Sequence, residues 1–222
     1  VITLFFFALF QIKHIEDMPD GISHTDIPED GYFWKRGNAS VSLYKKFQYS
    51  TIRTGARAKD YWGCLQWIED AGIVRKCYNL QMPELPLAGN AIDNVFKVYM
   101  ADTGLFVSML EDGTQADILQ GDLLGYKGAI FENLLADFLG KMQRPLYYYH
   151  KEGGLEIDFV MRYKGECTLL ECKATTGQAK SLRTILNNPD KYHIYQAIKI
   201  GSYNIGKSDG ILTIPHYLAF CL

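Results

Sequence analysis

The sequence lacks several short motifs that would reveal a function directly. None of its five cysteines forms a CxxC pair, and none of its five histidines has HxxH or HExxH spacing, so no zinc site is indicated. The odd number and scatter of the cysteines fit a reducing compartment better than a disulfide framework, and we expect a cytoplasmic protein. A GxxxxGK[ST] phosphate-binding loop is also missing, which argues against nucleotide binding of that kind.

Long apolar runs are missing as well. The opening VITLFFFALFQI holds about 10 apolar residues, whereas a membrane-spanning helix needs roughly 20. It has neither a positively charged start nor a small-residue cleavage site, so it does not resemble a signal peptide. We expect a buried helix or strand, no contact with a membrane, and no assignable domain over residues 1–43. Because the chain begins inside this run, the alternative is the tail of a longer segment.

Acidic residues are missing from Lys35 to Lys59, although the whole chain has a formal net charge of -2. A basic segment on an otherwise acidic protein is typical of a nucleic-acid contact, here DNA. The alternatives are a solvated loop or a face docked on an acidic neighbour. The segment contains seven cations, and we expect five of them to bind nucleic acid: Lys45, Lys46, Arg53, Arg57 and Lys59.

What the sequence does contain is the composition of a globular protein. Its 222 residues are 48% hydrophobic and 14% aromatic, enough for one large domain or two small ones. Apolar spacing predicts a helix that includes Tyr61, Leu65 and Ile68, ended by Gly72 in a left-handed conformation. A strand over 73–80 follows. A short helix, a glycine stop and a strand are typical of the second half of a winged helix, so we predict a winged-helix-like α+β domain over 44–88.

The prolines and glycine of MPELPLAG predict a linker, after which the pattern becomes that of an α/β domain over 89–222. VFKVYMADTGLF indicates a strand that runs into a turn. The order then predicted is helix, three strands, helix and strand, which gives a mixed sheet flanked by helices. Its parts are a helix over 126–140, strands over 146–150, 155–163 and 166–173, a helix over 180–186 and a last strand over 192–200.

The hairpin formed by LEIDFVMRYKGECTLLECKA carries charged residues at alternate positions. With a two-residue turn at Lys164 and Gly165, Asp158 lies opposite Glu171, and Glu156 lies opposite Lys173. Alternation then places these four residues on one face. The opposite face is predicted to be core and to carry Ile157, Phe159, Met161, Thr168, Leu170 and Cys172.

A solvated sheet face explains the alternation, but it explains less well why two carboxylates are paired. Like charges at paired positions cost on the order of 0.2–1 kcal/mol. Two carboxylates held together suit Mg²⁺ or Mn²⁺, because such hard cations take one or two carboxylates plus water and phosphate oxygens. Lys173 could then hold a water or a phosphoryl oxygen beside the metal. A bulge in either strand would change this geometry.

These residues resemble a known superfamily. IDF at 157–159 followed by ECK at 171–173 resembles the D…(D/E)xK signature of the PD-(D/E)xK, or restriction-endonuclease-like, superfamily. The resemblance implies that Asp158 and Glu171 are metal ligands and that Lys173 orients the attacking water or stabilises the developing charge. The helix GAIFENLLADFL resembles the one that carries a further acidic ligand, here Glu132. Glu156 has no implied role beyond pairing with Lys173.

A string of motifs from about Tyr44 to the end resembles one family in particular, the C-terminal region of prokaryotic AAA-type ATPases that is described as domain of unknown function 4143. The resemblance implies a winged helix followed by a nuclease-like fold, and an ATPase module as partner. Since this chain has no phosphate-binding loop, it is either a C-terminal fragment or a protein that has lost its ATPase module. The motifs are KKFQYSTIRTGARAKDYWGCLQWIEDAGIV, KVYMADTGLF, FEN, EIDFV, LECKA and AKSLR.

Three functions follow. The first is Mg²⁺- or Mn²⁺-dependent hydrolysis of DNA, with the basic segment holding the strand. The second is a catalytically idle module that binds nucleic acid or protein for an ATPase, which the net acidity of the nuclease-like half favours. The third is a purely structural oligomerisation domain. Gln178 and Lys180 could contact substrate and the tyrosines at 147–149 could stack on bases, but we expect Lys180 to be a surface lysine and the tyrosines to be core and edge residues.

Overall fold

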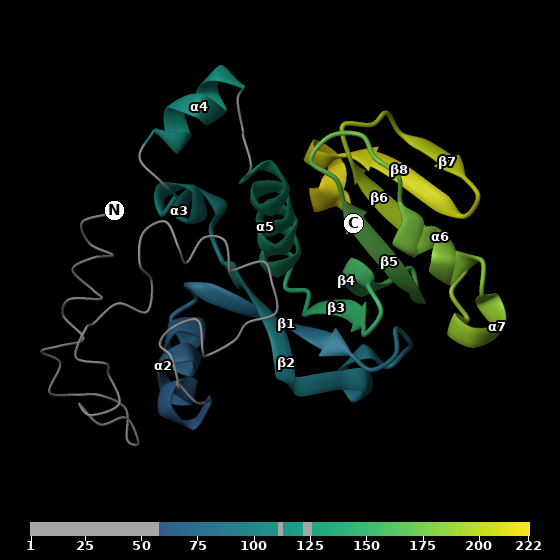
Figure 1. Ribbon diagram of the computed structural model, residues 1–222, viewed down its shortest axis with the longest axis horizontal. Helices are drawn as coiled ribbons and strands as arrows, with labels where there is room; N and C mark the ends of the chain where they lie inside the picture. The colour runs from purple at the N-terminus through teal and green to yellow at the C-terminus, as the bar shows by residue number, and fades with distance from the viewer. Residues whose placement is uncertain (1–57, 111–112, 122–125) are drawn as a thin grey trace, which may run out of the picture.

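The computed structural model describes residues 58–110, 113–121 and 126–222 (Figure 1). They form short helices and one large sheet. The elements in chain order are α2 (Ala58–Asp70), β1 (Val74–Leu80), the 3-10 helix η3 (Leu87–Asn90), β2 (Ala91–Met100), α3 (Thr103–Ser108), α4 (Thr114–Gln120), α5 (Lys127–Lys141), β3 (Leu146–Lys151), β4 (Leu155–Tyr163), β5 (Glu166–Cys172), α6 (Lys180–Leu186), α7 (Pro189–Tyr192), β6 (Ala197–Gly201), β7 (Gly206–Ser208), β8 (Ile211–Pro215) and the 3-10 helix η5 (His216–Cys221).

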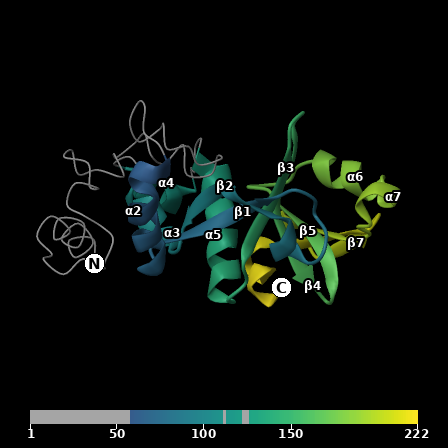
Figure 2. The ribbon, with the colours of Figure 1, turned by 90° about the horizontal axis from the view of Figure 1, so that it is seen from below.

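Within the described residues the strands form one eight-stranded sheet in the order β2-β1-β3-β4-β5-β6-β8-β7. The sheet is mixed, because β1 pairs with β3, β5 with β6 and β6 with β8 in parallel, while the other neighbours are antiparallel. Helices α2 and α3 lie towards one end of the molecule and α6 and α7 towards the other, with α5 between them (Figures 1 and 2). The predicted mixed α/β fold is confirmed.

The helix–glycine–strand unit of the first half forms as predicted. Leu65 and Ile68 are buried on α2, and Gly72 ends the helix with φ +70° before β1 begins. Strand β1, however, lies between β2 and β3 in the common sheet, and the predicted linker connects β1 with its neighbour β2. The winged-helix interpretation therefore stays a prediction, and the proposed boundary at residue 88 falls between two hydrogen-bonded strands.

The order helix, three strands, helix, strand is confirmed by α5, β3, β4, β5, α6 and β6. Two details of the prediction were wrong. Tyr192 ends the short helix α7 instead of starting a strand, because Pro189 at its first turn favours a helical start. Strand β6 is not the last strand, since β7 and β8 follow and extend the sheet edge.

The hairpin turn is confirmed. Lys164 and Gly165 have φ values of +51° and +90°, as a type I′ turn requires, and the pairs from Tyr163–Glu166 to Phe159–Leu170 keep the predicted register. On its other side β4 is irregular. The register between β3 and β4 shifts between Tyr147 and Tyr149, so that two residues of β4, Asp158 and Phe159, lie opposite one residue of β3.

This bulge changes which face the side chains of β4 occupy. Phe159 and Met161 pack in the core cluster with α5, whereas Ile157 packs in the cluster with α6. The prediction that these three residues share a face was wrong, because the extra residue reverses the alternation at this point. Asp158 and Glu156 consequently lie on the side of α5.

A third core cluster joins α2 and α3 to one face of β2 through Phe96, Val98 and Met100. The tyrosines of β3 are also core residues, since Tyr148 and Tyr149 are buried, which confirms the structural interpretation of that run. None of the helices in the described ranges is long and apolar enough to cross a membrane. The cytoplasmic location stays a prediction.

Candidate functional site

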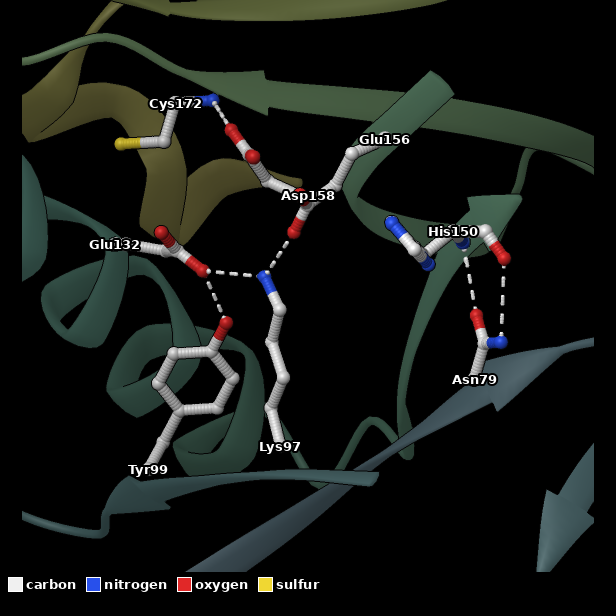
Figure 3. A network of polar contacts seen from close by, with 8 residues as sticks. All are labelled: Asn79, Lys97, Tyr99, Glu132, His150, Glu156, Asp158 and Cys172. Carbon is white, nitrogen blue, oxygen red and sulfur yellow. Dashed lines mark hydrogen bonds and ion pairs between the residues drawn. The ribbon is translucent and has the colours of Figure 1, made fainter. Parts of the chain in front are cut away.

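The site is built first on β2, whose residues alternate between two faces. While Phe96, Val98 and Met100 face the third core cluster, Lys97 and Tyr99 face α5. Both reach Glu132 on that helix: the Lys97 ammonium lies 3.1 Å from Glu132 Oε1, and the Tyr99 hydroxyl donates a hydrogen bond to the same oxygen (Figure 3). Burial, strengthened by the charge of Glu132, raises the pKa of Tyr99 well above its usual value.

Asn133, the residue after Glu132, fixes α5 to the end of β2. Its side-chain amide accepts a hydrogen bond from the Met100 N–H (2.9 Å) and donates one to the Met100 carbonyl (3.2 Å). The sequence interpretation missed Lys97, Tyr99 and Asn133 as site residues. The signal was present in KVYMADTGLF, where a lysine and a tyrosine two positions apart are expected on one face of a strand.

Glu156 completes the surroundings of Lys97. Its Oε1 lies 2.8 Å from the Lys97 ammonium, and the ring of Tyr148 lies with its centroid 5.0 Å from the same nitrogen. The predicted pairing of Glu156 with Lys173 was therefore wrong, since the bulge of β4 turns Glu156 towards β2. Nearby in Figure 3, Asn79 forms two hydrogen bonds with the backbone of His150 and so extends the pairing of β1 with β3.

Asp158 lies where the ladder between β4 and β5 ends. Its Oδ2 accepts a hydrogen bond from the Cys172 N–H at 2.8 Å, so the side chain replaces a backbone acceptor (Figure 3). Burial raises the pKa of Asp158 to about 8, and the charges of Glu132 and Glu171 act in the same direction, against Lys97 and the Cys172 N–H. A positive charge added near Asp158 would therefore stabilise the ionised form of its carboxyl group.

Glu171 and Lys173 form an ion pair with each other. Burial lowers the pKa of the Lys173 ammonium, but the hydrogen bond and charge of Glu171 outweigh this effect and raise it overall. Because Leu170 faces α5, strand alternation turns Glu171 to the opposite face. Asp158 lies on the side of α5, and the β4–β5 ladder ends at the pair Phe159–Leu170, so the prediction that Asp158 and Glu171 are paired on one face was wrong. Among the residues that the structure describes, the second oxygen of Glu171, Oε2, is buried and has no hydrogen-bond partner.

The backbone of Lys173 is held from two sides. Its N–H donates to the Ile200 carbonyl (2.7 Å), and its carbonyl lies 2.8 Å from Nε2 of His216. The His216 ring stacks on Phe131, which precedes Glu132 on α5. Burial lowers the pKa of His216, which favours the neutral ring. Through His216, the 3-10 helix η5 thus connects Lys173 to α5, the helix that carries Glu132.

The structure brings Glu132 and Glu156 together at Lys97, on which the charge of Asp158 also acts, and it places Glu171 with Lys173 one residue from the contact between Asp158 and Cys172. Among the described ranges, no three His, Cys, Asp or Glu side chains group as a metal site. The metal roles of Glu132, Asp158 and Glu171 stay predictions. Gln178 and Lys180 are exposed at the start of α6, as a surface lysine would be.

The basic segment falls almost wholly outside the described residues. Lys59 lies in α2, but its side chain is not among those described. The nucleic-acid role of the segment stays a prediction, also for Lys45, Lys46, Arg53 and Arg57, which precede the described part.

Fold and site together define a mixed α/β protein with a buried carboxylate–lysine site beside a β-hairpin. Residues 127–217, from α5 to the start of η5, match the family model of a domain of unknown function, DUF4143. Residues 15–116 match a second one, DUF8612. The DUF8612 match ends within α4, and the DUF4143 match begins at the first residue of α5. The match supports the domain of unknown function 4143 over 127–217, whereas the ATPase context, the winged helix and the nuclease-like fold stay predictions. No curated protein and no solved structure matches the chain.

Proposed function

We propose that this protein is a nuclease-like protein of the PD-(D/E)xK type that hydrolyses phosphodiester bonds in DNA with Mg²⁺ or Mn²⁺. Asp158 and Glu171 hold the metal and Lys173 is the catalytic cation. The observation that carries the proposal is a pair of carboxyl groups whose charges interact near the end of the β4–β5 ladder: one oxygen of Glu171 is buried without a hydrogen-bond partner among the described residues, and the pKa of Asp158 is raised to about 8.

These residues fit a hard divalent cation. Carboxylate oxygens are the ligands that Mg²⁺ and Mn²⁺ prefer, and Mg²⁺ often takes only one or two of them, with water and substrate phosphate oxygens as the rest. Asp158 contacts the backbone N–H of Cys172, the residue that separates Glu171 from Lys173. When bound, the metal would supply an activated water and offset the charge that develops on the phosphate.

The chain's own residues supply the remaining functions. Lys173 has a side chain that is 32% exposed, so it can exchange its ion pair with Glu171 for a phosphoryl oxygen of the substrate. His216 and Ile200 hold the backbone of Lys173 and so limit where its ammonium can reach. The basic segment that includes Lys45 and Arg57 would hold the DNA strand, and an ATPase module in the same protein or a partner subunit would supply movement.

A catalytically idle module that binds DNA or a partner protein is the second candidate. It is favoured by the fact that the carboxylates already have cations, because Lys97 pairs with Glu132 and Glu156 and Lys173 pairs with Glu171. In that case the basic segment would matter for binding, whereas the loss of Asp158 would be nearly silent.

The first prediction concerns Mn²⁺ binding and DNA cleavage, both measured on the same protein samples. Mn²⁺ is titrated calorimetrically into the wild type and the variants Asp158→Asn, Glu171→Gln and Glu166→Gln, and each sample is then incubated with single- and double-stranded DNA. Exposed Glu166 at the hairpin turn is the matched control. Asp158→Asn and Glu171→Gln should lose Mn²⁺ binding and at least about 100-fold in cleavage rate, equivalent to about 2.7 kcal/mol, and Glu166→Gln should lose neither.

Two outcomes would count against the proposal. A wild type that takes up no Mn²⁺ would exclude the metal-dependent reaction. If Mn²⁺ binds but neither DNA is cleaved, and Asp158→Asn binds DNA as the wild type does, the binding module becomes the better description.

A further inference from the structure

Lys97 is a buried lysine whose ammonium contacts two carboxylates. Its side chain is only 3% exposed, and its nitrogen lies 2.8 Å from Glu156 Oε1 and 3.1 Å from Glu132 Oε1. The ring of Tyr148 lies against the same ammonium, with its centroid at 5.0 Å. A lysine with this degree of burial needs such partners, because an unpaired charge in the interior is costly.

The oxygen atoms come from separate elements that only the tertiary fold brings together. Glu132 belongs to α5, Glu156 and Asp158 belong to β4, and the Tyr99 hydroxyl, which donates to Glu132, comes from β2 beside Lys97 (Figure 3). The charge of Asp158 also acts on Lys97. Two carboxylates, those of Glu132 and Glu156, thus meet at one position, and Mg²⁺ often takes only one or two carboxylates with water as the remaining ligands.

We propose that Lys97 is a fixed cation that fills a second cation position of the site, so that the protein accommodates one divalent metal ion and not two. Many phosphodiester-cleaving sites hold two metal ions close together. Here the ammonium supplies one of the two charges permanently. The metal at Asp158 and Glu171 rests on the proposed function, whereas the role of Lys97 depends only on the contacts described above.

The proposal reassigns Glu132. One of its oxygens is engaged by both Lys97 and Tyr99, and its side chain is only 17% exposed. Glu132 is thus a positioning residue that holds Lys97, while Glu156, whose side chain is 45% exposed, closes the position on its outer side. The pairing keeps both carboxylates compensated when no metal is present.

The experiment replaces Lys97 by methionine and counts Mn²⁺ ions. Methionine fills the space of the lysine stem and leaves the volume of the ammonium group free for an ion. MnCl₂ alone is titrated into the full chain by calorimetry, and thermal unfolding is followed with and without 1 mM MnCl₂. Lys97→Met should bind one Mn²⁺ more than the wild type, and Mn²⁺ should raise its unfolding midpoint by at least about 5 °C more than that of the wild type.

Lys76→Met is the matched control. Lys76 is equally buried, with a side chain that is 2% exposed, and its ammonium lies 2.6 Å from one oxygen of Glu69. Gln66 Oε1 lies 3.0 Å from the same ammonium, so one carboxylate and one amide oxygen meet at Lys76, whereas two carboxylates meet at Lys97. The lower negative charge at Lys76 should bind a divalent cation more weakly. The control should therefore lose stability without any gain in Mn²⁺ binding.

The stoichiometries separate this inference from the proposed function. One Mn²⁺ in the wild type and two in Lys97→Met support both. None in the wild type and one in Lys97→Met supports the fixed cation and contradicts the metal-dependent nuclease. Equal numbers in the two proteins, with equal shifts of the unfolding midpoint, overturn the inference.

A second variant covers the case in which Lys97→Met does not fold without metal. The variant Lys97→Gln keeps both carboxylates, and its amide group can donate a hydrogen bond to one of them and so offset part of their repulsion. Refolding of Lys97→Met in MnCl₂, together with the midpoint shift of Lys97→Gln, is then measured. Recovery of the fold by Mn²⁺ supports the proposal. Failure of Mn²⁺ to restore Lys97→Met, with no added shift in Lys97→Gln, overturns it.

Discussion

At the residue scale, the charge of Asp158 depends strongly on the fold. The carboxyl group has an ordinary pKa of 3.8, and burial raises it to about 8 in the folded protein. The folded state therefore binds a proton more tightly than the unfolded chain does. The contribution of this group to stability is fully present below pH 3.8 and is lost as the pH rises towards 8.

The pH dependence of stability gives a prediction for the metal-free protein. Asp158→Asn should stabilise the protein in EDTA, by an amount that grows from pH 5 to pH 8 by up to about 1.4 kcal/mol per pH unit. Asn keeps an oxygen that can accept from the Cys172 N–H. Urea unfolding at several pH values measures the difference, with exposed Asp93→Asn as control. A gap between wild type and variant that stays constant with pH would contradict the raised pKa.

At the scale of elements, the site depends on how α5 is fixed to β2. Lys97 and Tyr99 belong to the strand and Glu132 to the helix, so a small displacement between them would break the contacts around Lys97. Asn133 prevents this, since it is buried and makes two hydrogen bonds with the backbone of Met100. The hairpin of β4 and β5 is fixed separately by its type I′ turn.

Replacement of Asn133 by leucine tests this attachment. The variant leaves the N–H and the carbonyl of Met100 without their partners in a buried place, where each unpaired group costs about 1–3 kcal/mol. We expect the free energy of unfolding to fall by about 2–4 kcal/mol in urea titrations. Asn187→Leu, at an exposed position after α6, is the control. A loss no larger than that of the control would show that Asn133 does not anchor the helix.

At the scale of the whole molecule, the sheet runs without interruption through the predicted boundary at residue 88. Strand β1 precedes this boundary and β2 follows it, yet β1 lies between β2 and β3. Within the sheet, the strand that carries Lys97 is therefore connected to the hairpin that carries Asp158 through β1 and β3. The two family matches, over 15–116 and 127–217, likewise do not divide at residue 88.

Truncation tests whether a separate domain begins at residue 89 or whether one sheet spans both predicted domains. A protein of residues 89–222 lacks α2 and β1, so β2 has lost its neighbour in the sheet. We expect it to show no cooperative thermal unfolding and a weak near-ultraviolet circular dichroism signal, while residues 58–222 unfold cooperatively under the same conditions. Equal cooperativity and equal midpoints for both would support a separate domain that begins at residue 89.

The sequence by itself determined the elements whose causes are local. Apolar spacing gave α2, α5 and α6, a glycine gave the end of α2, and the Lys164–Gly165 turn gave the register of the hairpin, because a two-residue turn fixes which residues pair. It also indicated Asp158, Glu171 and Lys173 as the charged residues of interest.

Only the tertiary structure decided which of these charges meet. The bulge in β4 depends on its pairing with β3, a neighbour that the hairpin sequence does not specify, and it reversed the alternation at Asp158 and turned Glu156 towards Lys97. Lys97 and Glu132 are 35 residues apart in the chain and meet because α5 packs on the face of β2. Contacts of this kind arise from packing between elements, whereas local sequence patterns report only the elements themselves.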